Sequence, residues 1–301
     1  MNVSRGEIYD LGYRNYEGPR LGRWYVVRSL TALSLRHTFG FGRGVGPKVI
    51  AFSLIAFTLI PALVQVALGV LVPEDFEFVR PEEYYGFVQV IIILFVAAMA
   101  SELVGNDRRN NVLPLYFSRP LERSDYVFAK VTALTLGLQA LTLVPQMLMF
   151  LGNWLGAADQ SKWLSDNISD LPAIIASALL VSAEFAAIAI VIATFASKRA
   201  FALVGILGAM LVSSIVTGVL SDFLPLGAAR VVMLLSPIYV TRAVTFVLFD
   251  AMPRTRSMET AQGVGDQIGA ADLPGAVWIA ACVVHIALAV WFAVLRYRDT
   301  I

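Results

Sequence analysis

Long apolar stretches alternate with polar segments along this 301-residue chain, and six of the stretches have the length of a membrane span. A helix needs about 20 mostly apolar residues to cross roughly 30 Å of hydrocarbon. Because lipid offers backbone groups no hydrogen-bond partner, continuous apolar runs of this length form helices rather than barrel strands. The pattern predicts an all-α integral membrane protein with spans at about Val49 to Val72, Tyr84 to Val104, Val127 to Leu151, Leu171 to Ala196, Ala200 to Leu220 and Ala276 to Leu295.

The segment before the first span, residues 1–47, contains a predicted amphipathic helix over 20–39. Its apolar and polar residues separate at helical spacing, although Arg28 and Arg36 fall on the apolar side. Those two arginines can extend their aliphatic stems toward lipid headgroups. We expect an interfacial helix lying on the cytoplasmic leaflet, the alternative being a helix packed against a partner protein.

The segment between the fifth and sixth spans, residues 222–274, includes an apolar stretch from Val231 to Phe249 that Ser236-Pro237 interrupts. A seventh crossing here would place the basic tail outside the cell. The break therefore favours two short helices that re-enter the membrane or lie at its outer leaflet. A polar external loop is expected from Arg254 to Asp272.

Composition and charge agree with a membrane protein and give it an orientation. Hydrophobic residues make up 58% of the chain and charged residues only 15%, which excludes an ordinary soluble domain. Of the 23 Lys and Arg residues, 17 fall on the side of the termini in the six-span topology. The positive-inside rule then predicts cytoplasmic termini in a multi-pass protein of the cell (inner or plasma) membrane.

Several other kinds of protein are disfavoured by what the sequence contains. The net charge of +1 gives no reason to expect a nucleic-acid partner, and the single cysteine, Cys282, excludes an intramolecular disulfide. The glycine-rich stretch over 40–47 lacks the register of a phosphate-binding loop, so we expect a hinge there and no ATP site in this chain. The first 45 residues lack the apolar core of a signal peptide, and no soluble part is long enough to form a core of its own. We therefore expect one transmembrane domain over residues 1–301.

The polar segment between the second and third spans is the most informative part of the sequence. Residues 105–130 carry five basic residues and lie between two spans, so the positive-inside rule places them in the cytoplasm. The pattern indicates a docking loop rather than a catalytic site. The basic residues are Arg108, Arg109, Arg119, Arg123 and Lys130.

The order of these features resembles the permease subunits of ABC-2-type ABC exporters over nearly the whole chain. The most specific piece is the loop from Leu115 to Lys130, in which Ser-Arg-Pro is followed by Arg and then Lys. It is similar to the branch that includes the permease of the nitrous-oxide-reductase maturation system. A Ser236-Pro-Ile-Tyr-Val-Thr-Arg242 element before the last span adds to the likeness.

The resemblance implies an exporter half, in which two identical or homologous permeases form the substrate path and each rests on a separate ATP-binding subunit. That subunit would bind ATP and Mg, and this chain would need no cofactor of its own. The resemblance also implies a coupling helix within Asn106 to Asp125 and a surface elbow formed by the N-terminal helix. The residues predicted to dock the partner are Arg108, Arg109, Arg119, Pro120 and Arg123, with positive-inside arginines at lipid headgroups as the alternative.

Two acidic residues are candidates for the transport path. Glu184 lies near the middle of the fourth span, where an ionised carboxylate costs about 2.5–3.5 kcal/mol, so protonation, a water-filled cavity or a hydrogen bond must compensate it. The candidate hydrogen-bond partners are Gln89, Gln139, Gln146 and His285. Glu102, at the cytoplasmic end of the second span, is expected in a polar network there.

Two other functions agree less well with the sequence than an exporter does. A membrane-embedded enzyme needs converging nucleophiles or metal ligands, and the spans supply one Glu, one His and one Cys without metal-ligand spacing. An ATP-independent secondary transporter is favoured by internal repeats and broken spans. Pro61 and Pro145 interrupt two spans, but the two halves of the chain show no obvious repeat.

Overall fold

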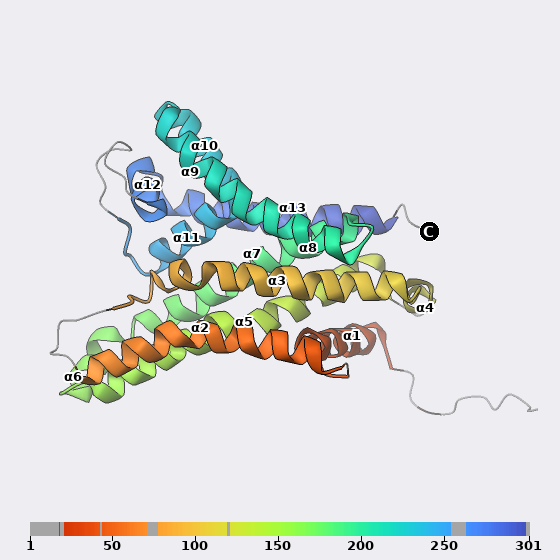
Figure 1. Ribbon diagram of the computed structural model, residues 1–301, viewed down its shortest axis with the longest axis horizontal. Coiled ribbons are helices and arrows are strands. Elements are labelled where there is room, and N and C mark those ends of the chain that lie inside the picture. Colours follow the sequence, from red (N-terminus) through yellow and green to blue (C-terminus); the bar gives the residue numbers. More distant parts are fainter. Residues whose placement is uncertain are drawn as a thin grey trace, which may run out of the picture.

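The helices of this protein run mostly parallel to one long axis, as the computed structural model in Figure 1 shows. The structure describes residues 18, 21–42, 44–71, 78–118, 121–253 and 263–298. Within these ranges the elements are α1 (Arg23–Thr38), α2 (Val45–Leu71), α3 (Tyr84–Arg109), α4 (Leu113–Phe117), α5 (Arg123–Gly156), α6 (Gln160–Asn167), α7 (Asp170–Phe195), α8 (Arg199–Leu207), the π-helix η1 (Gly208–Val212), α9 (Ser213–Phe223), α10 (Leu226–Leu235), α11 (Pro237–Leu248), α12 (Val264–Ala271) and α13 (Gly275–Arg298).

Six of the described helical segments are long and apolar enough to cross a membrane, which confirms the all-α multi-pass fold. They are α2, α3, α5, α7, the continuous run of α8, η1 and α9, and α13. Four of the six predicted spans fall inside these helices, the one predicted to end at Ala196 ends at Phe195, and Val72, the predicted end of the first span, lies outside the described residues. Helix α3 extends to Arg109 and α5 begins at Arg123. The polar segment between the second and third spans is therefore shorter than the sequence predicted, because residues at both of its ends belong to helices α3 and α5.

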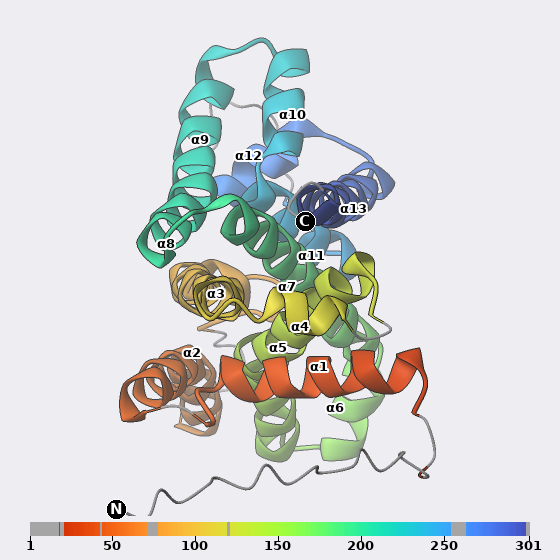
Figure 2. The same cartoon turned by 90° about the vertical axis from the view of Figure 1, so that its right-hand side faces the viewer.

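Three of the spans form the interior of the bundle and three surround it. The most apolar windows of α3, α5 and α7 are 61%, 56% and 61% buried, whereas those of α2, the α8–α9 run and α13 are 22%, 17% and 22% buried. Alanines such as Ala186, Ala189 and Ala193 are buried along α7. Small side chains let neighbouring helices approach closely within a membrane, which explains the central position of α7 in Figure 2.

Helix α1 crosses one end of the bundle instead of following its axis (Figures 1 and 2). It packs along α5, where a methyl group added at Gly137 would collide with the side chain of Thr38. The two helices can approach closely because Gly137 has no side chain. The helix predicted over 20–39 is thus present as Arg23–Thr38, and its location at a membrane surface remains a prediction.

The connection between the fifth and sixth spans breaks where the sequence predicted. Helices α10 and α11 meet at Ser236 with a bend of 96°. The expected polar loop over 254–272 was partly wrong, since Val264–Ala271 forms α12, while residues 254–262 lie outside the described residues. Ile268 and Ala271 are fully buried in a cluster with Tyr239 and Trp278, and this apolar contact explains the helix.

Candidate docking site at the α4 end of the bundle

The end of the bundle that carries α4 also gathers α1, the end of α3, the starts of α5 and α8 and the end of α13 (Figures 1 and 2). We call it the α4 end. The opposite end, which carries α6 and α12, is called the α6 end. Of the residues proposed from the sequence for docking, Arg108, Arg109 and Arg123 lie at the α4 end.

Helix α4 is a single short helix held between two spans. Asn111, with a φ of 51°, turns the chain after α3, a conformation that asparagine tolerates better than most residues. Pro114 lies in the first turn of α4, where its fixed φ favours the helix and its missing N–H is not needed. The rings of Tyr116 and Phe117 pack against Tyr126 of α5, with centroids 6.0 and 6.1 Å apart. Leu115 remains 66% exposed and is the apolar side chain that α4 presents to solvent.

A buried ionic network lies directly beneath α4. The ammonium of Lys130 on α5 is 2.7 Å from the carboxylate of Asp107 on α3, and both side chains are buried. The hydroxyl of Tyr126 donates to the same carboxylate at 2.8 Å, and Tyr126 stacks edge-on against Tyr297 of α13 at 5.1 Å. This network joins three spans at the α4 end.

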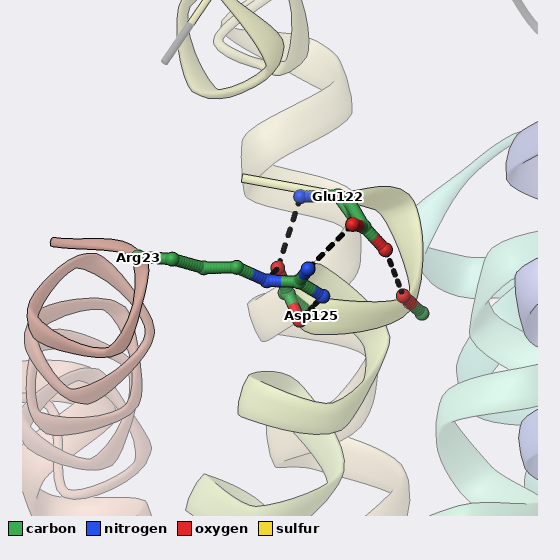
Figure 3. A network of polar contacts seen from close by, with 4 residues as sticks. Arg23, Glu122 and Asp125 are labelled. Carbon is green, nitrogen blue, oxygen red and sulfur yellow. Dashed lines mark hydrogen bonds and ion pairs between the residues drawn. The ribbon is translucent and has the colours of Figure 1, made fainter. Parts of the chain in front are cut away.

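A second ionic contact ties α1 to the start of α5 (Figure 3). Arg23 donates to both carboxylate oxygens of Asp125 at 2.7 Å and to Glu122 at 2.5 Å. Glu122 and Asp125 also form a capping box that satisfies backbone N–H groups at the start of α5. The hydrogen bonds to Asp125 raise the pKa of the Arg23 guanidinium, so this side chain remains charged. We call this contact the Arg23 clamp.

Arg108 and Arg109 end α3, but they differ in surroundings. The guanidinium of Arg108 donates to the carbonyl oxygens of Thr194 and Ala196 at 2.9 and 2.8 Å. It thereby caps the C-terminus of α7, where a cation is stabilised by the exposed carbonyls. Arg109 is exposed and donates to the side-chain oxygen of Asn106 at 3.0 Å. Charge reversal at Arg108 would therefore disturb the fold as well as any docking.

The remaining predicted docking residues lie on the other side of α4 or outside the described residues. Arg123 is half-buried at the first position of α5 and lines a shallow cavity of about 410 Å³ with Phe117, Leu121 and Val294. Arg119 and Pro120 fall outside the described residues. The structure thus brings Arg108 and Arg109 together at the end of α3 and places Arg123 apart from them.

Glu102 joins Arg108 and Arg109 around a larger cavity between α3, α7 and α8. Its carboxylate is 2.5 Å from the guanidinium of Arg199, the first residue of α8. The cavity has a volume of about 490 Å³. Its lining comprises Ser101, Glu102, Gly105, Asn106, Arg108, Arg109, Ala193, Ala196, Ser197, Lys198, Arg199 and Ala202. We call it the α3–α8 cavity.

Glu184 lies away from these contacts, in the middle of the bundle. Its side chain is fully buried, and one carboxylate oxygen is 2.6 Å from Nδ1 of His285 on α13. Of the four hydrogen-bond partners proposed from the sequence, His285 is the one that the structure pairs with Glu184. The pair links α7 to α13 within the spans, and a hydrogen bond of this kind compensates part of the cost of burying the carboxyl group.

Four residues of the site were not predicted from the sequence, namely Arg23, Asp107, Glu122 and Asp125. Glu122 and Asp125 have a visible signal, because acidic residues three apart at the start of an apolar helix are typical of a helix N-terminus. The partners Arg23 and Asp107 have no such signal, since their contacts join residues far apart in the chain. Compared with protein-family models, with curated proteins and with solved structures, the chain shows no match.

Proposed function

We propose that this chain is the permease subunit of an ATP-binding-cassette exporter, driven by a separate ATP-binding subunit that docks on α4. The observation that carries the proposal is the placement of α4. It is a short helix between the second and third spans, Pro114 lies in its first turn, and it presents an exposed Leu115. Basic residues flank it on both sides in the sequence. The sequence resemblance to ABC-2-type permeases points to the same segment.

The contacts around α4 suit an element that transmits a rigid-body movement. Packing of Tyr116 and Phe117 on Tyr126 connects α4 to α5, and the buried Asp107–Lys130 pair connects α5 to α3. Through the Arg23 clamp the same start of α5 holds α1. A displacement of α4 by a partner would therefore be passed to two spans and to α1 instead of being absorbed in a loose loop.

The proposed exporter has a defined orientation in the membrane and contains a second permease. The α4 end is cytoplasmic, with both termini on that side, and α1 lies at the membrane surface. A second permease, identical or homologous, packs against peripheral spans, whose apolar windows are the least buried in this chain. ATP and Mg are bound by the ATP-binding subunits, present in two copies. Glu184 lies near the transport path, and Glu102 belongs to a polar network at its cytoplasmic end.

The direct test is reconstitution with a candidate ATP-binding subunit encoded near this chain in the genome. We expect the two proteins to purify together and the complex to export substrate only with ATP. Leu115→Asp should reduce both co-purification and stimulated ATPase activity by more than tenfold, because a charge replaces the apolar contact at the centre of the interface. The matched control is Ile168→Asp, which changes another exposed apolar residue, 52% exposed, at the α6 end and should have little effect.

A second variant separates docking from transmission. Arg23→Gln removes the clamp between α1 and α5 but leaves α4 unchanged, so the ATP-binding subunit should still bind while transport per ATP falls. Arg23→Lys should restore only part of the transport, since an ammonium cannot reproduce the two-pronged contact with Asp125. Transport by the chain alone in vesicles without ATP would contradict the proposal and favour a secondary transporter.

A further inference from the structure

The α3–α8 cavity is a basic pocket that shares Arg108 and Arg109 with the predicted docking residues but includes no residue of α4. Four cationic side chains line it, Arg108, Arg109, Lys198 and Arg199, against the single carboxylate of Glu102. Arg108 is engaged with backbone carbonyls and Arg199 with Glu102. In the part of the chain that the structure describes, no carboxylate pairs with Arg109 or Lys198, and both are exposed. The lining of the cavity therefore carries more positive than negative charge.

Neutral donors in the lining also suit an anion. Ser197 and Asn106 contribute a hydroxyl and an amide to the cavity. Lys198 is the N-cap residue of α8, and its side chain makes no capping hydrogen bond. The backbone N–H groups in the first turn of α8 therefore receive no acceptor from the N-cap side chain. Helix N-termini bind phosphate through such groups. Together with the surrounding cations, this favours a phosphate group as the occupant.

The position of the cavity indicates that this phosphate carries acyl chains. The cavity lies where α3 and α7 end and α8 begins, which is the level of lipid headgroups for spans of this length. Exposed apolar side chains adjoin it in the sequence, with Phe195 at 56%, Phe201 at 62% and Val204 at 64% exposed. Basic pockets between spans on the cytoplasmic side are known to bind anionic lipid headgroups.

We propose that the α3–α8 cavity binds the headgroup of an anionic phospholipid. Arg109 and Lys198 hold the phosphate, Ser197 and Asn106 donate hydrogen bonds to it, and the acyl chains lie along the exposed apolar side chains of α7 and α8. The bound lipid bridges α3 to α8, the start of the least buried span, and stabilises their contact. This goes beyond the exporter proposal, because it concerns the isolated chain and requires no ATP-binding subunit.

The test measures lipid binding to the purified full chain in a neutral detergent. Short-chain phosphatidylglycerol, short-chain phosphatidylcholine and inorganic phosphate are titrated separately, with binding followed by native mass spectrometry and by thermal unfolding. We expect phosphatidylglycerol to bind and raise the unfolding temperature, and the other two to have little effect. Equal stabilisation by inorganic phosphate would overturn the lipid assignment in favour of a free-phosphate site.

Two double variants with equal loss of charge locate the site. Arg109→Gln with Lys198→Gln removes both exposed cations of the cavity and should weaken phosphatidylglycerol binding about 30-fold. Arg28→Gln with Arg36→Gln removes two exposed cations from α1 and should leave binding within about twofold. Unfolding temperatures measured without lipid confirm that both variants are folded. Equal weakening by the two pairs, or equal binding of phosphatidylcholine, would overturn the proposal.

Discussion

The two ends of the bundle hold their helices together by different chemistry. At the α4 end the helices are joined by ion pairs, namely Asp107–Lys130, Arg23 with Glu122 and Asp125, and Glu102–Arg199. At the α6 end they are joined by hydrogen bonds in which at least one of the two groups is neutral; Arg230 of α10, for example, donates to the carbonyl oxygen of Ala271 of α12 at 2.7 Å. Gln267 of α12 donates to Gly218 and Asp222 of α9, Tyr239 of α11 donates to Gln267, and Gln65 of α2 accepts from the backbone before α3.

This difference indicates different roles for the two ends. The Asp107–Lys130 pair is buried, and a charge left alone in a buried position is costly, so this pair holds α3 and α5 in register. The more exposed pairs of Arg23 and Arg199 and the hydrogen bonds of the α6 end contribute modestly. The contacts of the α4 end thus keep α1, α3 and α5 together, as the proposed docking on α4 requires, whereas those of the α6 end hold short helices in place.

The largest expected effect comes from the buried pair at the α4 end. Lys130→Met leaves the carboxylate of Asp107 buried without its ammonium partner and should destabilise the fold by about 3–5 kcal/mol. Titration of the unfolding equilibrium with a denaturing detergent measures this loss of unfolding free energy. Adding Asp107→Leu to Lys130→Met should recover most of it, because the double variant leaves no unpaired charge. If the single and double variants lost the same stability, the pair would not be holding α3 to α5.

A smaller effect is expected at the α6 end. Gln267→Ala removes the amide that bonds Gly218, Asp222 and Tyr239, and should cost about 2 kcal/mol of unfolding free energy. Gln160→Ala is the matched control, since that amide is exposed and makes one bond to Leu155. It should change stability by less than about 0.5 kcal/mol. A loss at Gln267 as large as that of Lys130→Met would contradict the distinction between the two ends.

The smallest effect on stability is expected between the two ends, at Glu184. Interhelical hydrogen bonds in membranes average about 0.6 kcal/mol, and glutamine keeps the shape of the side chain, so Glu184→Gln should assemble normally. Transport should fall partly while ATPase stimulation persists, if the carboxyl group acts in the path. Wild-type transport by both Glu184→Gln and Glu184→Ala would assign the pair with His285 to packing alone.

The spans could be predicted from the sequence because their signal is local. Each apolar run carries its own information about crossing the membrane, and Ser236-Pro237 marks the break between α10 and α11 without reference to any other segment. The extension of α3 to Arg109 could not be predicted in this way. Asp107 is buried within a helix only because Lys130 and Tyr126 of another span satisfy it.

The candidate site was predictable in its location but not in its contacts. The basic residues between the second and third spans identify the α4 end, yet nothing local distinguishes Arg108, which caps α7, from the exposed Arg109 beside it. His285 can be identified as the partner of Glu184, among the four candidates, only when the packing of α7 on α13 is known. Helix α12 was missed because it packs on α11 and α10, while the residues before it in the sequence are polar.

The measurement that tests the central claim most directly is site-specific cross-linking to the ATP-binding subunit. Leu115→Cys on α4 and Ile168→Cys at the α6 end are each prepared in a Cys282→Ala background, which removes the single native cysteine. The account predicts a cross-link from residue 115 to the ATP-binding subunit and none from residue 168. A co-purified complex that cross-links from residue 168, or that never cross-links from residue 115, would contradict docking on α4.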